Sequence, residues 1–80
     1  AVPEFVAEIR SQSDRLITLR DKMREYLENG VLLAWLIDVP EQRVEIYRAG
    51  GEVTVVEGFD SKLTGETILP GFEFDLMWMK

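Results

Sequence analysis

The chain contains no cysteine and no histidine. The absence of cysteine excludes disulfides and thiolate chemistry, and it fits a reducing, cytoplasmic compartment. The absence of histidine removes the most common zinc ligand and the most common general base, so a Ser-His-Asp hydrolase is excluded on this chain. No apolar run approaches the length of about 18 residues that a transmembrane helix needs, and no signal-peptide pattern is present. We therefore expect no membrane association.

The length of 80 residues predicts one domain over residues 1–80. A domain of this size buries only about 60% of the surface that its unfolded chain exposes, which favours support from a partner or a second copy. Apolar residues make up 46% and charged residues 30%, as in an ordinary globular protein.

Negative charge dominates the chain, but positive charge is concentrated near its beginning. The net charge of −6 argues against nucleic-acid binding by the whole surface. Residues 10–24 nevertheless hold five of the nine basic residues and only two acids. This segment is therefore either a local positive patch or a solvated helix face with internal ion pairs.

Apolar periodicity predicts a strand followed by a helix. Residues 5–10 alternate, so one face of this strand, with Phe5, points to the core and the other carries Glu8. Ser13 is predicted as the N-cap of a helix whose apolar residues recur from Leu16. Gly30 is predicted to end that helix in the left-handed conformation.

The rest of the chain predicts further strands and no second long helix. Residues 31–37 form an apolar run typical of a strand buried on both faces. Residues 43–48 and 52–57 alternate around Gly50-Gly51, which predicts a hairpin. We expect a polar loop over residues 58–67 and a last alternating segment from Phe72 to Trp78, as core or dimer seam. The result is an α+β fold built as one β-α-β-β-β unit.

Several landmarks in fixed order resemble one known family. They are Pro3-Glu4-x-x-x-Glu8-x-x-Ser11-x-Ser13, Asp21-Lys22-x-x-x-Tyr26, Gly30-Val31-x-x-x-Trp35-x-Ile37-Asp38 and Gly65-Glu66-x-x-Leu69-Pro70-Gly71-Phe72. Together they resemble the C-terminal half of the Uma-two family of restriction endonucleases, within the PD-(D/E)XK nuclease superfamily. The resemblance covers essentially the whole chain. It implies a mixed sheet with one main helix, as part of a restriction-endonuclease-like core.

The resemblance also implies a chemistry, namely hydrolysis of a DNA phosphodiester that depends on Mg²⁺ or Mn²⁺. Glu8 matches the second catalytic acid and a metal ligand, and Ile9 would lend its backbone carbonyl to the metal. Lys22 matches the catalytic lysine, which would orient or activate water and stabilise phosphoryl charge. Tyr26 matches an aromatic residue that flanks the site and is a candidate for substrate binding, although an aromatic of the core with a polar tip fits it as well.

Two basic residues near the strand–helix junction are candidates for substrate binding. Arg10 and Arg15 can hold DNA phosphates, or they can pair with Glu4 and Asp14 or with acids on a second chain. Asp38 fits a turn residue at a strand end better than a ligand.

The family's first catalytic acid lies upstream of residue 1, so we expect an incomplete active site on this chain. Three interpretations stay open. The chain is part of a nuclease that needs its N-terminal half or assembly as a homo-oligomer, a fragment of a larger nuclease, or a catalytically dead relative that acts as a small homodimeric interaction module.

Overall fold

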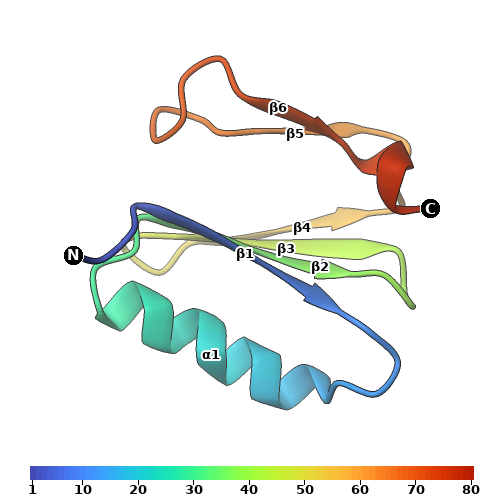
Figure 1. Cartoon of the computed structure of the whole chain (residues 1–80), viewed down its shortest axis with the longest axis horizontal. Coiled ribbons are helices and arrows are strands. Elements are labelled where there is room, and N and C mark those ends of the chain that lie inside the picture. The colour runs from blue at the N-terminus through green and yellow to red at the C-terminus, as the bar shows by residue number, and fades with distance from the viewer.

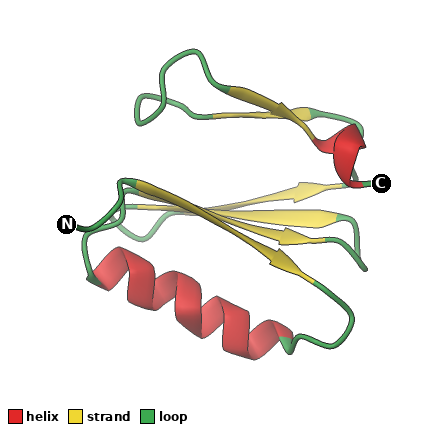
Figure 2. Ribbon diagram, viewed as in Figure 1, coloured by secondary structure: helices red, strands yellow, loops and turns green.

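Three layers stack in the computed structural model, which describes residues 1–80 (Figure 1). The middle layer is a sheet of four strands: β1 (Phe5–Arg10), β2 (Leu33–Asp38), β3 (Arg43–Arg48) and β4 (Val53–Glu57). One face of the sheet is covered by helix α1 (Leu16–Glu28). The opposite face is covered by a hairpin of β5 (Lys62–Thr64) and β6 (Glu73–Asp75), followed by a 3₁₀ helix at Leu76–Met79 (Figure 2).

The sheet is mixed, and its strands follow chain order. β1 pairs with β2 in parallel, whereas β2–β3 and β3–β4 are antiparallel. A parallel pair needs a crossover connection, and α1 supplies it. The predicted α+β fold, with one main helix and a β-α-β-β-β unit, is therefore confirmed. Neither helix is long and apolar enough to cross a membrane.

Both ends of α1 can be explained by local hydrogen bonds. At the C-terminal end Gly30 has a φ of +102°, as predicted, and Val31 N–H donates to the Tyr26 carbonyl in a Schellman arrangement. At the N-terminal end the predicted cap at Ser13 is wrong, because the helix begins after Arg15 without a side-chain cap. The turn before the helix is closed by Asp14, whose carboxylate accepts from Ser11 N–H.

Strand β2 is buried along its whole length, as the apolar run over residues 31–37 predicted, but it begins only at Leu33, and Leu32 before it is exposed. Strand alternation sends Leu33, Trp35 and Ile37 to the hairpin side, where they pack in one core cluster. Ala34 and Leu36 point to the helix side and pack in a second cluster. The two clusters on opposite faces explain why this strand carries no exposed position.

The predicted ends of the later elements need two corrections. Residues 58–67 are not simply a polar loop, because they include β5 and bury Phe59 and Leu63 in the core. The last segment is not one strand from Phe72 to Trp78. β6 ends at Asp75, whose carboxylate accepts from Met77 N–H and starts the 3₁₀ helix. The predicted turn at Gly50-Gly51 is confirmed, with φ near +97° at both glycines.

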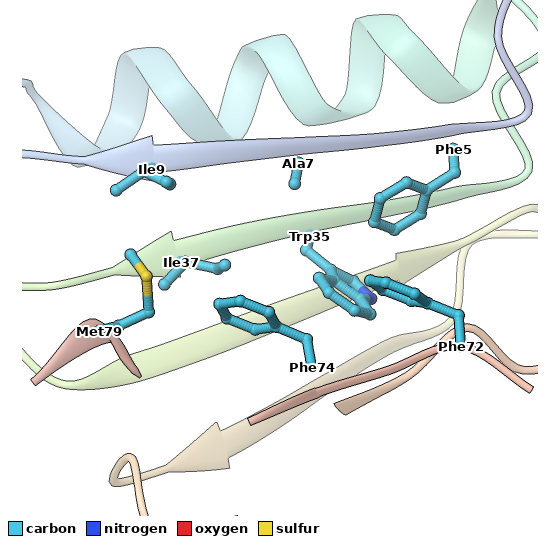
Figure 3. A pocket seen from close by; sticks show the side chains of 8 residues that line it. All are labelled: Phe5, Ala7, Ile9, Trp35, Ile37, Phe72, Phe74 and Met79. Carbon is cyan, nitrogen blue, oxygen red and sulfur yellow. The ribbon is translucent and has the colours of Figure 1, made fainter. Parts of the chain in front are cut away.

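An apolar pocket of about 200 Å³ lies between the sheet and the β5–β6 hairpin (Figure 3). Its lining is entirely hydrophobic: Phe5, Ala7, Ile9, Trp35, Ile37, Phe72, Phe74 and Met79. Trp35 forms its centre and meets Phe5 edge to face, with 4.8 Å between the ring centroids. The buried indole N–H of Trp35 has no hydrogen-bond partner.

Candidate active site

The strongest cluster of reactive side chains lies on the other face of the sheet, between β1 and α1. Alternation along β1 turns Glu8 toward the helix and away from the apolar pocket. Tyr26 donates its hydroxyl hydrogen to Glu8 Oε2 at 2.6 Å, and Lys22 Nζ lies 3.2 Å from the same oxygen. Glu8 Oε1 accepts no hydrogen bond from the protein. The structure thus brings together three of the residues predicted for the site.

Helical spacing explains how two of these groups reach one carboxylate. Lys22 and Tyr26 are four residues apart, so they share one edge of α1. The neighbouring apolar stripe, which includes buried Met23, packs on the sheet and holds that edge over β1. The Lys22 ammonium also lies 5.9 Å from the centroid of the Tyr26 ring.

The Glu8 carboxylate favours the protonated forms of both of its partners, Tyr26 and Lys22. The hydrogen bond from Tyr26 to Glu8 raises the pKa of the Tyr26 phenol, and partial burial adds to the shift. The contact with Glu8 also raises the pKa of Lys22. Lys22 therefore stays an ammonium at neutral pH, which suits stabilisation of negative charge better than proton abstraction.

A second polar network on the same sheet face was not predicted. Glu45 on β3 is only 5% exposed, and its oxygens accept hydrogen bonds from Arg20 Nε at 3.1 and 3.0 Å. Arg20 Nη2 adds a bond of 2.6 Å, and the Tyr47 hydroxyl donates to Glu45 Oε1 at 2.6 Å. The available signal was the alternation of β3, which puts Glu45 and Tyr47 on one face.

Burial and hydrogen bonding act in opposite directions on Glu45. Burial by itself would raise the pKa of Glu45, but the hydrogen bonds from Arg20 and Tyr47 hold this pKa below its usual value. Burial, followed by the bond to Glu45, raises the pKa of Tyr47. Glu45 is thus an ionised, paired carboxylate under the helix.

Arg10 is held in place by acidic and backbone groups. Its Nη1 lies 2.8 Å from Asp38 Oδ1, and its Nε donates to the Asp14 carbonyl at 3.1 Å. It forms no ion pair with Glu4, which was one of the alternatives. Asp38 does act at a turn, because it also accepts from Glu41 N–H. Its second oxygen is buried without a partner.

The basic segment of residues 10–24 is largely neutralised by ion pairs. Four of its five basic residues have acidic partners, namely Arg10, Arg20, Lys22 and Arg24. Arg15 is exposed and forms no ion pair. Only the pair of Arg24 with Asp21 is internal to the segment, as the solvated-face interpretation predicted. The other three basic residues pair with acids on the sheet, and Arg15 is the one free cation of the segment.

The residues of this chain fit a magnesium ion only in part. Mg²⁺ prefers oxygen ligands in octahedral geometry and is bound through one or two carboxylates, waters and substrate phosphates. Glu8 offers one carboxylate oxygen free of protein hydrogen bonds, but no group of three or more acidic residues is assembled anywhere in the chain. The metal-binding roles of Glu8 and of the Ile9 carbonyl stay predictions.

Comparison with known proteins agrees with the geometry of the fold. The model of the Uma2 family, described as "Putative restriction endonuclease", matches residues 1–77. The fold is similar to a crystal structure described as "a putative nuclease belonging to DUF820" from Anabaena variabilis ATCC 29413, with a TM-score of 0.80 and 22% sequence identity. The match covers 95% of this chain and 42% of that chain, so this chain spans less than half of its length. No curated protein matches.

Proposed function

Because this chain belongs to the Uma2 family of restriction-endonuclease-like proteins, we propose that it carries part of the active site of a Mg²⁺-dependent nuclease that hydrolyses DNA phosphodiesters. The observation that carries the proposal is the meeting of Glu8, Lys22 and Tyr26 at one carboxylate oxygen. A carboxylate, an ammonium and a phenol at the junction of a strand and a helix are suited to phosphoryl chemistry.

Each side chain has a distinct role in this proposal. Glu8 binds the cation through Oε1, while Tyr26 and Lys22 hold Oε2 and so fix the plane of the carboxylate. The Ile9 carbonyl is a further ligand. Lys22 is about half exposed, so its ammonium is available to a phosphate that arrives at Glu8. There it would stabilise the charge that develops on the phosphoryl oxygens.

A bound Mg²⁺ or Mn²⁺ would act as a Lewis acid and lower the pKa of an attacking water. Since Glu8 is the one carboxylate at this position, ligands other than Glu8 and the Ile9 carbonyl would come from waters, substrate and groups outside these 80 residues. The site is therefore incomplete on this chain alone.

Arg15 and Arg10 differ in how freely they could contact the DNA backbone. Arg15 is exposed and unpaired, so it can bind a phosphate without breaking a contact. Arg10 would have to give up its partner Asp38, and we expect it to contribute through the positioning of the 10–15 turn instead.

The proposal is tested by calorimetric titration of Mg²⁺ and Mn²⁺ into the chain and its Glu8→Gln variant. We expect binding to the chain and none to the variant. Glu4→Gln is the matched control, because Glu4 is an exposed acid just before β1 and forms no ion pair. Equal binding by the chain and the Glu8 variant would contradict the assignment of Glu8.

Activity is tested with DNA as the substrate and Mg²⁺ or Mn²⁺ present. We expect Glu8→Gln and Lys22→Met to abolish metal-dependent cleavage of plasmid DNA, while Glu4→Gln leaves it unchanged. Full cleavage by either of the first two variants would remove that residue from the mechanism.

A second function is favoured by a different observation. Strand β1 is an edge strand, and its Phe5, Ala7 and Ile9 line the open apolar pocket. An unpaired strand edge next to apolar surface is a template for pairing, so the chain can also act as a homodimeric interaction module. Analytical ultracentrifugation of the chain and of Ile9→Lys tests this. A monomer at every concentration would contradict it.

A further inference from the structure

We propose that Arg20, Glu45 and Tyr47 form a clamp that sets the rotation of α1 and thereby positions Lys22 and Tyr26 on Glu8. The proposal rests on the proposed function only in giving the Glu8 cluster a catalytic role. The clamp itself is a matter of geometry. Its members are positioning residues, because their side-chain hydrogen bonds join them to one another and none of them reaches Glu8.

The two polar networks lie on opposite sides of the buried stripe of the helix. The buried stripe of α1, with Met23 at its centre, packs on the sheet. Lys22 and Tyr26 flank one side of this stripe and reach β1, whereas Arg20 flanks the other side and reaches β3. Contacts on both sides of a helix oppose rotation about its axis in either direction.

The register of the sheet beneath the helix places the two carboxylates in one row. Glu8 pairs with Leu36 across β1–β2, and Leu36 pairs with Glu45 across β2–β3. The two carboxylates therefore stand in one row on the same face, separated by a single apolar side chain. The sheet fixes this separation, so a helix held at Glu45 presents its other edge at a constant height over Glu8.

The clamp is more rigid than an apolar contact. Arg20 binds both oxygens of Glu45 through its planar guanidinium, which specifies direction as well as distance. Tyr47 fixes the same carboxylate from its own strand. The apolar stripe alone would tolerate small rotations, because packing of side chains such as leucine and methionine is less directional.

The experiment reads the pKa of Tyr26, which is raised by its hydrogen bond to Glu8. Tyrosine labelled with ¹³C at Cζ gives two signals, since the chain has two tyrosines, and Tyr26→Phe and Tyr47→Phe assign them. In Arg20→Met we expect the pKa of Tyr26 to fall toward its ordinary value of 10.0. A folded Arg20→Met variant in which this pKa stays raised would overturn the proposal.

Two further variants control for folding and for loss of charge. Arg24→Met removes an arginine one turn later on α1 that pairs only with Asp21, so we expect the pKa of Tyr26 to be unchanged. If Arg20→Met does not fold, Arg20→Met combined with Glu45→Leu leaves no unpaired buried charge, and such replacements are often tolerated. We expect the pKa of Tyr26 to fall there too, and a raised pKa in that folded variant would equally overturn the proposal.

Activity gives an independent reading in the whole protein. If α1 rotates, kcat for DNA cleavage should fall on the order of 10²-fold with little change in KM, because small misplacements of catalytic groups have effects of this size. Arg24→Met should keep both constants. The pKa measurement needs neither metal nor DNA, so failure of the nuclease assignment leaves it interpretable, and a fall in the pKa of Tyr26 without any nuclease activity separates the two ideas.

Discussion

The two faces of the sheet are stabilised by different means. Under α1, the apolar contacts are interrupted by charged groups that have specific partners, as in Tyr26–Glu8 and Arg20–Glu45. Under the β5–β6 hairpin, the pocket lining contains no charged residue at all. Directional bonds fix orientation, whereas apolar burial supplies most of the stability. Arg48 on β3 also binds both carboxylate oxygens of Glu66 on the hairpin side, so that face has a charged contact as well, outside the pocket. The reactive groups gather on the helix side, and the apolar pocket lies on the hairpin side.

Substitutions on the hairpin side of the sheet should cause the largest losses of stability. Trp35→Ala removes the centre of the hairpin-side cluster and should destabilise the chain by about 3–5 kcal/mol, enough to unfold much of a domain of this size. Urea unfolding followed by far-ultraviolet circular dichroism measures the change. Trp35→Phe should have a much smaller effect, because the lost indole N–H has no partner. Equal losses in the two variants would show that this face depends on more than buried volume.

The second largest loss of stability is expected for the clamp, and its size should depend on pH. Glu45→Gln leaves Arg20 without its ionic partner and should destabilise the chain by about 2 kcal/mol at neutral pH. Because the pKa of Glu45 is lower in the folded chain than its ordinary value of 4.5, its ion pair stabilises the fold above that value. This contribution is lost as the pH falls through the folded pKa.

Urea unfolding between about pH 3 and pH 7 checks this prediction. This interval spans the usual pKa range of a carboxyl group, roughly 3 to 5. We expect the stability of the parent chain to decrease toward low pH more steeply than that of Glu45→Gln. Glu57→Gln is the control, because Glu57 is an exposed acid in an ion pair with Arg43. Parallel pH profiles for the parent chain and the Glu45 variant would contradict the role of this pair.

A smaller effect is expected at the candidate active site. Tyr26→Phe removes one hydrogen bond to a partly exposed carboxylate and should cost about 1 kcal/mol. Tyr47→Phe should cost more, because the acceptor Glu45 is buried. The difference between the two midpoints in urea measures how much burial adds. A larger loss in Tyr26→Phe would mean that the Glu8 cluster is more important for stability than the clamp.

The smallest effect is expected for exposed ion pairs. Arg43→Ala breaks a pair with Glu57 on the surface of β3 and β4, and it should change stability by less than about 0.5 kcal/mol. The same urea experiment at low and high salt measures it. A change as large as that of Glu45→Gln would remove the distinction between buried and exposed pairs on which the comparison depends.

The strands and the main helix were predictable because their periodicities are long and uninterrupted. Two strands were predicted, one from the alternation of residues 5–10 and one from the apolar run before Asp38, and Gly30 predicted the end of α1. The hairpin of β5 and β6 was not predicted, because strands of three residues are too short to show alternation. The cap at Ser13 was predicted from its residue type alone. In the structure Asp14 closes the turn by accepting from Ser11 N–H, and the helix begins after Arg15.

The sequence predicted which residues belong to the candidate site, but not which hydrogen bonds and ion pairs they form. Spacing placed Lys22 and Tyr26 on one edge of a helix, and alternation placed Glu8 on one face of a strand. Their common contact depends on how the helix packs, which no local pattern specifies. Arg20 and Glu45 are 25 residues apart, so only the register of the sheet brings them together. The roles of Glu8, Lys22, Tyr26, Ile9, Arg10 and Arg15 in catalysis, metal binding and substrate binding stay predictions.

The chain-order arrangement of the sheet has a consequence for how the molecule forms. Each strand pairs with its successor along the chain, so the longest loop that must close within the four-stranded sheet is the one containing α1. Closing such local loops costs little entropy, and folds rich in local contacts reach the native state quickly. We expect β2, β3 and β4 to assemble first as an antiparallel meander. Strand β1, with Glu8, would then join last, so the fold would be completed at the place where its reactive groups meet.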